Sequence, residues 1–193
     1  MSEAQTMPLS APAPRAPVHH RRVECRGYRR PDGLWDIEGH LIDTRDADFV
    51  LRFDDRTVRA GEPIHAMSVR LTIDPDMTVR AIEACADAVP TEICPGAVAQ
   101  MQCLVGLRIA PGWTNAVKQR LGGPRGCTHL MELMWPVATT AYQTLAGHNA
   151  ERTFAPAQPG RKPAKLDSCW AYAADREVVR RFWPEHHVAA RID

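Results

Sequence analysis

The run His65-Ala66-Met67-Ser68-Val69-Arg70-Leu71-Thr72-Ile73 decides the fold, because apolar and polar side chains alternate along it. Successive side chains of a strand point to opposite faces, so this pattern predicts a strand with one buried face and one solvated face. His65 has the parity of the apolar residues and is expected to begin the buried side. Asp74-Pro75-Asp76 follows and predicts a turn in which an aspartate accepts hydrogen bonds from the backbone.

Three further strands are predicted around this one. Leu34 to Asp43 alternates in the same way, with Trp35, Ile37 and the residues of that parity on one face. Phe49 to Phe53 is a short apolar run that predicts a second strand. Thr78 to Ala86 can return as a fourth strand, although its alanines also permit a helix.

The second half of the core favours helices. Cys94-Pro95 begins a helical stripe that stops at Gly106, and Thr114 can cap a short helix that ends at Gly122. A long helix is predicted from Thr128 to about residue 145, with a kink at Pro136. Strands followed by helices indicate the α+β class, here an antiparallel sheet of three to four strands followed by about three helices.

The ends of the chain predict less regular structure. We expect a disordered N-terminal arm over residues 1–20, an α+β core domain over 21–150 and a linker over 151–166, because the first and third are rich in proline and alanine. Residues 167–193 form a C-terminal extension expected to pack on the core, as a small hairpin or a helix between 167 and 184. The basic run from His19 to Arg30 is interpreted as a solvated arm leading into a strand.

Composition excludes several classes of function. Lys plus Arg number 24 against 23 Asp plus Glu, so no charge excess predicts a nucleic-acid partner. No apolar run is long enough to cross a membrane or to form a signal-peptide core, which predicts a cytoplasmic protein. The six cysteines are then expected to be reduced, and no CxxC pair or nucleotide-binding motif occurs.

The segment Gly126 to Leu133 predicts a functional site. It places Cys127 and His129 at a helix start, where backbone amides and the helix dipole favour a thiolate. A thiolate and a neutral imidazole are good ligands for zinc or iron, and they could equally act as nucleophile and base. Glu132, one turn further along, could transfer protons or merely complement the helix N-terminus.

Other candidates lie outside this segment. His65 is either a ligand or a buried neutral imidazole, and Cys94 repeats the position of Cys127 at a predicted helix start. His40 lies near Asp36, Glu38 and Asp43, either in a proton-transfer or ligand set or on a solvated face. The predicted metal ligands are Cys127, His129, His65 and Cys94, and the predicted catalytic residues are Glu132 and His40.

Several motifs together carry a resemblance to a known family. They are Cys25 to Arg30, Asp32 to His40, His65 before its strand, Leu104 to Trp113, and Gly126 to Leu133. With these motifs the chain resembles, from about residue 21 to 145, the bacterial domain-of-unknown-function family 2889. That family has no generally established activity, so the resemblance implies little about function.

A weaker similarity concerns the order of the elements. Strands, then Cys94 and a helix, then Cys127 at the start of the last long helix are similar in order to iron–sulfur cluster scaffold proteins. This likeness implies that His65, Cys94 and Cys127 converge on zinc or a cluster, with His129 nearby. The chain lacks the usual first cysteine and the Lys-His-Cys run of those proteins.

Two classes of function follow as hypotheses. The first is a small metal-dependent enzyme that uses zinc or iron to act on an organic metabolite. The alternative is a non-enzymatic accessory or scaffold protein that binds a partner enzyme, an acyl carrier or a metal centre. A metal-free thiol enzyme with Cys127 as nucleophile is a third. Exposed edge strands could also pair two copies in a homodimer.

Overall fold

The computed structural model describes residues 9–150 and 162–189. The chain divides into two compact units, Met1–Ala141 and Tyr142–Asp193, and each is described by itself. The first unit contains the sheet and most of the helices, and it holds every residue of the candidate site.

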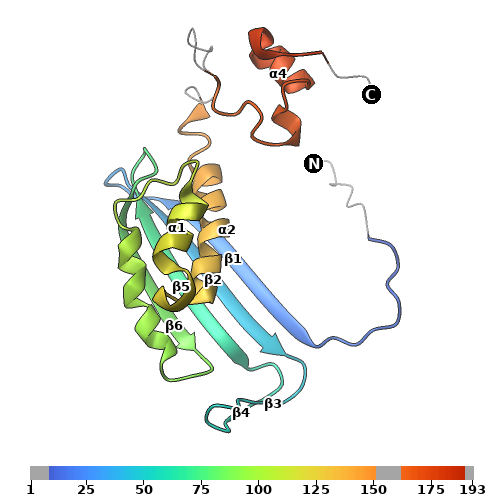
Figure 1. Cartoon of the computed structure of the whole chain (residues 1–193), viewed down its shortest axis with the longest axis vertical. Helices are drawn as coiled ribbons and strands as arrows, with labels where there is room; N and C mark the ends of the chain where they lie inside the picture. The colour runs from blue at the N-terminus through green and yellow to red at the C-terminus, as the bar shows by residue number, and fades with distance from the viewer. Residues whose placement is uncertain (1–8, 151–161, 190–193) are drawn as a thin grey trace. The chain divides into compact units, whose positions relative to one another are not determined.

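A four-stranded antiparallel sheet forms the first unit, in the order β1-β2-β5-β6. Its strands are β1 (His19–Arg29), β2 (Trp35–Arg45), β5 (Pro63–Ile73) and β6 (Val79–Ala88). Helices of the same unit cover one face of the sheet and leave the other bare (Figure 1). Strands followed by helices confirm the predicted α+β class.

The alternation along β5 builds the covered face. Met67, Val69, Leu71 and Ile73 are each 2 % exposed or less, as the predicted strand requires. Their neighbours across β2 share this parity, and Leu71 lies opposite Ile37. One apolar layer therefore runs across the two central strands.

One strand prediction was wrong, and another is confirmed only for its first two residues. The basic run predicted as a solvated arm forms β1 from His19 onward and pairs with β2 along eleven residues without a register shift. Phe49–Val50 (β3) does not join the main sheet but pairs with Thr57–Val58 (β4) in a separate two-stranded ribbon. The ribbon, the following Leu51 and Ile64 of β5 together bury a small apolar cluster.

The helical half differs from the prediction in its first part. Instead of one helix, Cys94–Ala97 (η1) and Ala99–Leu104 (η2) are 3₁₀ helices. Helix α1 spans Trp113–Leu121, and Gly112 rather than Thr114 holds its cap position with a φ of 96°. A further turn, η3 (Gly123–Arg125), precedes α2.

Helix α2 (Thr128–Thr144) continues through Pro136, as predicted for the long helix. Its apolar stripe packs on the covered face of the sheet, where Trp113 of α1 also donates a hydrogen bond from Nε1 to the Met134 carbonyl at 3.2 Å. The stripe is formed by Leu130, Leu133, Met134, Val137, Ala138 and Ala141.

The second unit contains three short helical elements, η4 (Trp170–Tyr172), α4 (Glu177–Phe182) and η5 (Pro184–His186). Of the two conformations left open for 167–184, the helix is therefore confirmed. Trp183 is fully buried against Tyr172 and Phe182. Residues 151–161 of the predicted linker and 1–8 of the predicted arm lie outside the described residues, and the packing of 167–193 on the core stays a prediction. Among the described residues, no helix combines the length and apolarity needed to cross a membrane.

Candidate metal site

A buried carboxylate lies at the centre of the candidate site. Asp43 is near the end of β2 and has the parity of Trp35, Ile37 and Leu41, so it faces the helices rather than solvent and is 1 % exposed. The register places Arg21 of β1 and His65 of β5 directly opposite it on either side. A register shift in the β2–β5 pairing follows immediately after Asp43, and such bulges re-aim side chains next to functional sites.

Arg21 binds this carboxylate in a fork. Its Nε donates to Oδ1 at 2.7 Å and its Nη2 donates to Oδ2 at 2.8 Å, while Nη1 donates to Glu132 Oε2 on α2 at 2.8 Å. His19 Nε2 lies 3.1 Å from Oδ1 of Asp43. One guanidinium thus joins two strands and a helix around a single buried carboxylate, a geometry that arginine suits.

Two imidazoles approach the other side of Asp43. His65 Nδ1 lies 3.2 Å from Oδ2, and His129 Nε2, from the first turn of α2, lies 3.7 Å from the same oxygen. Their rings lie against one another with centroids 3.8 Å apart at 31°. Asp43, His65 and His129 each offer a ligand atom, and these atoms lie within 4.8 Å of one another.

One of these nitrogens is not satisfied by the protein. His65 Nδ1 is buried and makes no hydrogen bond within the described part of the chain, although Asp43 Oδ2 is near it. Buried polar atoms without a partner are uncommon and frequently mark the place of a water or an ion. The atom faces the point where the three side chains converge.

The protonation states suit cation binding. Burial, with the nearby charge of His129, lowers the pKa of His65, and burial with the charge of Arg21 lowers the pKa of His129. Burial works to raise the pKa of Asp43, but the hydrogen bonds and charge of Arg21 outweigh it, and the net pKa is below its usual value. At neutral pH the site therefore offers two neutral imidazoles and one carboxylate, the forms that bind metal.

Cys127 supports this cluster from one side. Its Sγ lies 3.9 Å from His129 Nδ1 and 3.7 Å from Met67 Sδ. A contact of Nδ1 with sulfur leaves Nε2 of His129 directed to Asp43. Metal-binding histidines commonly have their second nitrogen held in this way.

Two of the distances between ligand atoms are near those around a small tetrahedral ion. Ligand atoms about 2.0–2.1 Å from a tetrahedral ion lie about 3.3 Å from each other, and the two approaches to Asp43 Oδ2 are 3.2 and 3.7 Å. For both imidazole nitrogens to direct their lone pairs at one ion, the stacked rings of His65 and His129 must rotate away from each other. Arg21 Nη2 must then share or leave Oδ2, while its Nε can keep Oδ1.

The predicted site residues fall in different places. The structure brings His65 and His129 together with Cys127 beside them, and Glu132 reaches the cluster through Arg21. Cys94 is not in this cluster. It begins η1, and its Sγ lies 3.1 Å from Thr91 Oγ1.

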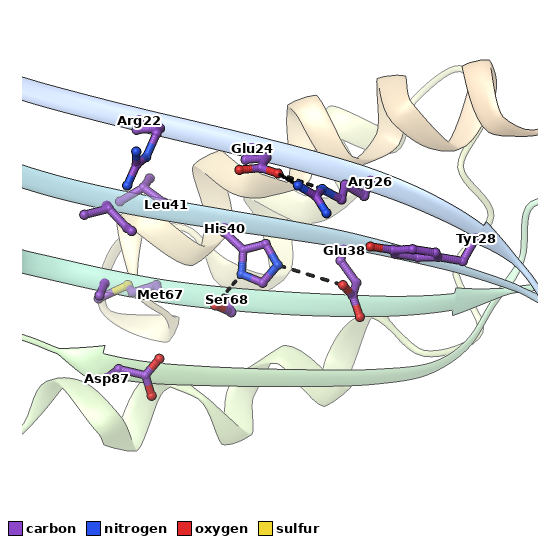
Figure 2. Close-up of a pocket in the computed structure, with 12 residues that line it drawn as sticks. Arg22, Glu24, Arg26, Tyr28, Glu38, His40, Leu41, Met67, Ser68 and Asp87 are labelled. Carbon is purple, nitrogen blue, oxygen red and sulfur yellow. Dashed lines mark hydrogen bonds and ion pairs between the residues drawn. The ribbon is translucent and has the colours of Figure 1, made fainter.

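His40 lies on the bare face of the sheet, opposite the cluster. Figure 2 shows its ring between Ser68, whose Oγ is 2.8 Å from Nδ1, and Glu38, 3.9 Å from Nε2. A hollow of about 480 Å³ covers this face and also includes Arg22 and Asp87. Neither Asp43 nor the two histidines of the cluster line it.

The sequence prediction did not place three residues of the cluster, Asp43, Arg21 and His19, beside His65 and His129. Asp43 was grouped with His40 on the polar face, yet its odd number places it with Ile37 and Leu41 on the buried face. An acid at a buried position of a strand was the available signal. Arg21 and His19 were missed because β1 was interpreted as an arm.

Comparison with known proteins identifies a family but no individual curated protein or solved structure. No curated protein matches the chain, and no solved structure matches it. A family model described as "Protein of unknown function (DUF2889)" matches residues 19–143, which include β1, the rest of the main sheet and nearly all of α2. The chain therefore belongs to the DUF2889 family of proteins of unknown function.

Proposed function

We propose that this protein binds one divalent transition-metal ion, zinc or ferrous iron, through Asp43, His65 and His129. The observation that carries the proposal is the buried carboxylate oxygen with two imidazole nitrogens at 3.2 and 3.7 Å, one of them without a hydrogen bond among the described residues. Two histidines and one carboxylate are a common ligand set for ferrous iron and also for zinc. Oxygen and imidazole ligands at this spacing do not select between the two metals.

A metal-dependent enzyme is the function that this site supports best. Three protein ligands leave a coordination position for water or substrate, as catalytic sites do and closed structural sites do not. A bound ion would supply a polarised carbonyl or an activated water for a small organic metabolite. Glu132 is about half exposed beside Arg21, where it can carry a proton between the reacting molecule and solvent.

Solvent can reach the cluster from the edge formed by β1 and α2. The side chains of His65 and His129 are 16 % and 21 % exposed, whereas those of His19 and Arg21 are 44 % and 38 % exposed. Exposure rises outward from Asp43 toward this edge. A substrate would therefore approach on the side of Glu132 of α2, which is about half exposed.

One observation favours a second candidate, an accessory protein. The large hollow lies over the bare face of the sheet and not over the metal ligands. Substrate sites are usually concave, so a partner protein could provide the missing wall. In that case the chain would hold or deliver metal and would show no turnover alone.

Elemental analysis tests the metal site. The untagged protein, purified anaerobically, is compared with His65→Gln, His129→Gln and Asp43→Asn, with His40→Gln as a matched control on the opposite face. We expect near-stoichiometric zinc or iron in the native protein and in the control, and loss of the metal in the three variants. Metal-free native protein that also fails to bind added Zn²⁺ or Fe²⁺ in calorimetry would contradict the proposal.

Substitution of the bound metal by Co²⁺ then distinguishes a site with a thiolate ligand from one with only imidazole and carboxylate ligands. Its visible absorption reports a four- or five-coordinate site, and thiolate ligation adds a charge-transfer band that imidazole and carboxylate do not. Metal-loaded protein screened against esters, amides and hydroxy acids tests the enzyme. If it binds metal but turns over none of them, and retains a partner during purification, the accessory role is the better description.

A further inference from the structure

The two edges of the main sheet are unequal. The β6 edge is interrupted by register shifts and is covered in part by η2, where Gln102 Nε2 donates to the Ile82 carbonyl at 2.8 Å. The β1 edge has neither protection. It runs for eleven residues without proline or a bulge, and no described residue of the first unit pairs with its outer side.

A strand of this length with an open edge is a template for another strand. Natural proteins usually shorten, bend, cover or interrupt such edges, because the unpaired N–H and C=O groups recruit other chains. Ten of the eleven residues of β1 are exposed, and Cys25 is the exception. The exposed residues include Val23 and Tyr28, at 44 % and 43 %.

We propose that a second copy of this chain pairs with β1 along this edge, antiparallel and centred on Cys25. A two-fold axis through Cys25 joins two four-stranded sheets into one of eight and places the helices of both copies on the same face. Side chains directly opposite in such a pair share a face and lie about 4.5–5.5 Å apart at Cβ. The occupant is a second copy because the edge is complementary to itself.

The charges on the bare face show this complementarity. Figure 2 shows Arg22, Glu24, Arg26 and Tyr28 in a row along β1. The two-fold axis brings Glu24 opposite Arg26 of the other copy, twice, and Arg22 opposite Tyr28, twice. Within one chain Glu24 already accepts a hydrogen bond from Arg26 Nε at 2.7 Å, so the seam would extend each pair into a four-membered charge network.

The covered face places small residues at the seam, with one kind of like-charge pair, which the two-fold axis makes twice. Val23 faces Gly27 of the other copy, which leaves room for the valine. Arg21 faces Arg29, but each guanidinium is already occupied. Arg21 binds Asp43 and Glu132, and Arg29 lies over the Trp35 ring at 5.7 Å. These contacts therefore reduce the electrostatic repulsion between Arg21 and Arg29 across the seam, near the ends of the paired strands.

Charge reversal tests the register. The mass of the full-length protein in solution is measured by light scattering over a wide range of concentration, for the native chain and for Glu24→Arg, Arg26→Glu and the double variant. Each single reversal makes two repulsive pairs, so we expect the dimer dissociation constant to rise about tenfold or more. The double reversal restores opposite charges and should restore the dimer. Arg70→Glu is the matched control, since Arg70 pairs with Glu38 on the same face but on inner strands.

Cross-linking tests the seam without relying on charge. In a background with Cys25 at the two-fold axis and the exposed Cys85, Cys103 and Cys169 all changed to serine, Glu24→Cys mixed with Arg26→Cys should form a disulfide-linked dimer under mild oxidation, and neither variant alone should. The proposal is overturned if the native protein is monomeric at every concentration measured, for example because its own C-terminal unit covers β1. It is also overturned by a dimer that both single reversals leave intact, or by one that the double reversal fails to restore.

Discussion

Val137 of α2 occupies the space that a side chain at Gly39 of β2 would need. A Cβ atom built on Gly39 would lie 2.6 Å from Val137 Cγ2, well inside van der Waals contact. Asp43 lies four residues along β2 from this contact, about 13 Å. His129 lies eight residues along α2 from it, about 12 Å. The close approach of helix and strand at Gly39 thus sets the register that brings His129 to Asp43.

Gly39→Ala is expected to destabilise the fold by about 1–3 kcal/mol, because the new methyl group overpacks a rigid contact. Chemical denaturation measures the change. Gly39→Ala with Val137→Ala should recover part of the loss, since the smaller side chain makes room. Gly96→Ala is the control, because nothing lies within 4 Å of a Cβ there, and it should change stability by less than about 0.5 kcal/mol. Equal effects at the two glycines would contradict the packing argument.

Arg21→Met removes the cation that neutralises Asp43 and keeps an apolar stem of similar length. An unpaired buried carboxylate is costly, so we expect a loss of about 2–4 kcal/mol of unfolding free energy, below the largest known cases because Arg21 is partly exposed. Asp43→Asn in the same chain should recover part of this loss. Arg70→Met removes an ion pair on the bare face, in which Nε and Nη2 of Arg70 both contact Oε1 of Glu38, and should cost less than about 1 kcal/mol.

Metal should compensate for the missing arginine. In Arg21→Met the carboxylate has no competing guanidinium, so Zn²⁺ is expected to raise the thermal midpoint more than it does in the native protein. Thermal melts with and without Zn²⁺ or a chelator measure this difference. If Zn²⁺ does not change the thermal midpoint of Arg21→Met, this result would count against ligation by Asp43.

The sequence predicted the parts of this molecule that depend on local pattern. The alternation of β5 and the apolar stripe of α2 gave correct elements because each has one buried face. β1 escaped prediction because it is exposed along nearly its whole length, so no apolar period marks it. The 3₁₀ helices from Cys94 onward also carry a helical stripe, which does not reveal the tighter winding.

The site was predictable only in part for a related reason. His65 and His129 were identified from their positions, but their partner was not, because Asp43 is brought to them by strand pairing and not by nearness in sequence. The arginine that holds Asp43 lies on the strand that was missed. In the sequence, Cys94 and Cys127 both occupy a predicted helix start. Only the fold shows that Cys127 lies beside the cluster and Cys94 does not.

Cys127→Ser tests whether the thiol is a ligand or a support. Since Sγ faces Nδ1 of His129, on the far side of the ring from Asp43, we expect the variant to keep its metal with an affinity about 10–100-fold lower. His129→Gln should lose the metal altogether. The Co²⁺ spectrum of the native protein should lack a thiolate charge-transfer band. A strong band that disappears in Cys127→Ser would instead make the cysteine a ligand.

Asp74 stabilises the turn between β5 and β6 in a manner that depends on pH. Its Oδ1 accepts hydrogen bonds from the Asp76 and Thr78 amides, each at 2.9 Å, and its Oδ2 accepts one from Arg80 Nε at 2.8 Å. Burial opposes ionisation, but the Thr78 amide and Arg80 outweigh it, so the pKa of Asp74 lies below its usual value. A carboxyl with a lowered folded-state pKa contributes stability above its unfolded pKa, about 3.9, and loses it as the pH falls through the folded value.

Asp74→Asn should therefore cost about 1.5–3 kcal/mol near neutral pH, the range for hydrogen bonds to a charged group. The difference from the native protein should stay constant down to about pH 5 and shrink below about pH 4, where the native carboxyl takes up its proton. Urea unfolding at a series of pH values measures it, with Asp46→Asn, at an exposed position outside this turn, as the control for a general effect of the substitution. A difference independent of pH would mean that the charge of the carboxylate is not its cause, since asparagine keeps one acceptor oxygen for the two amides and replaces the Oδ2 acceptor of Arg80 with an NH2 donor.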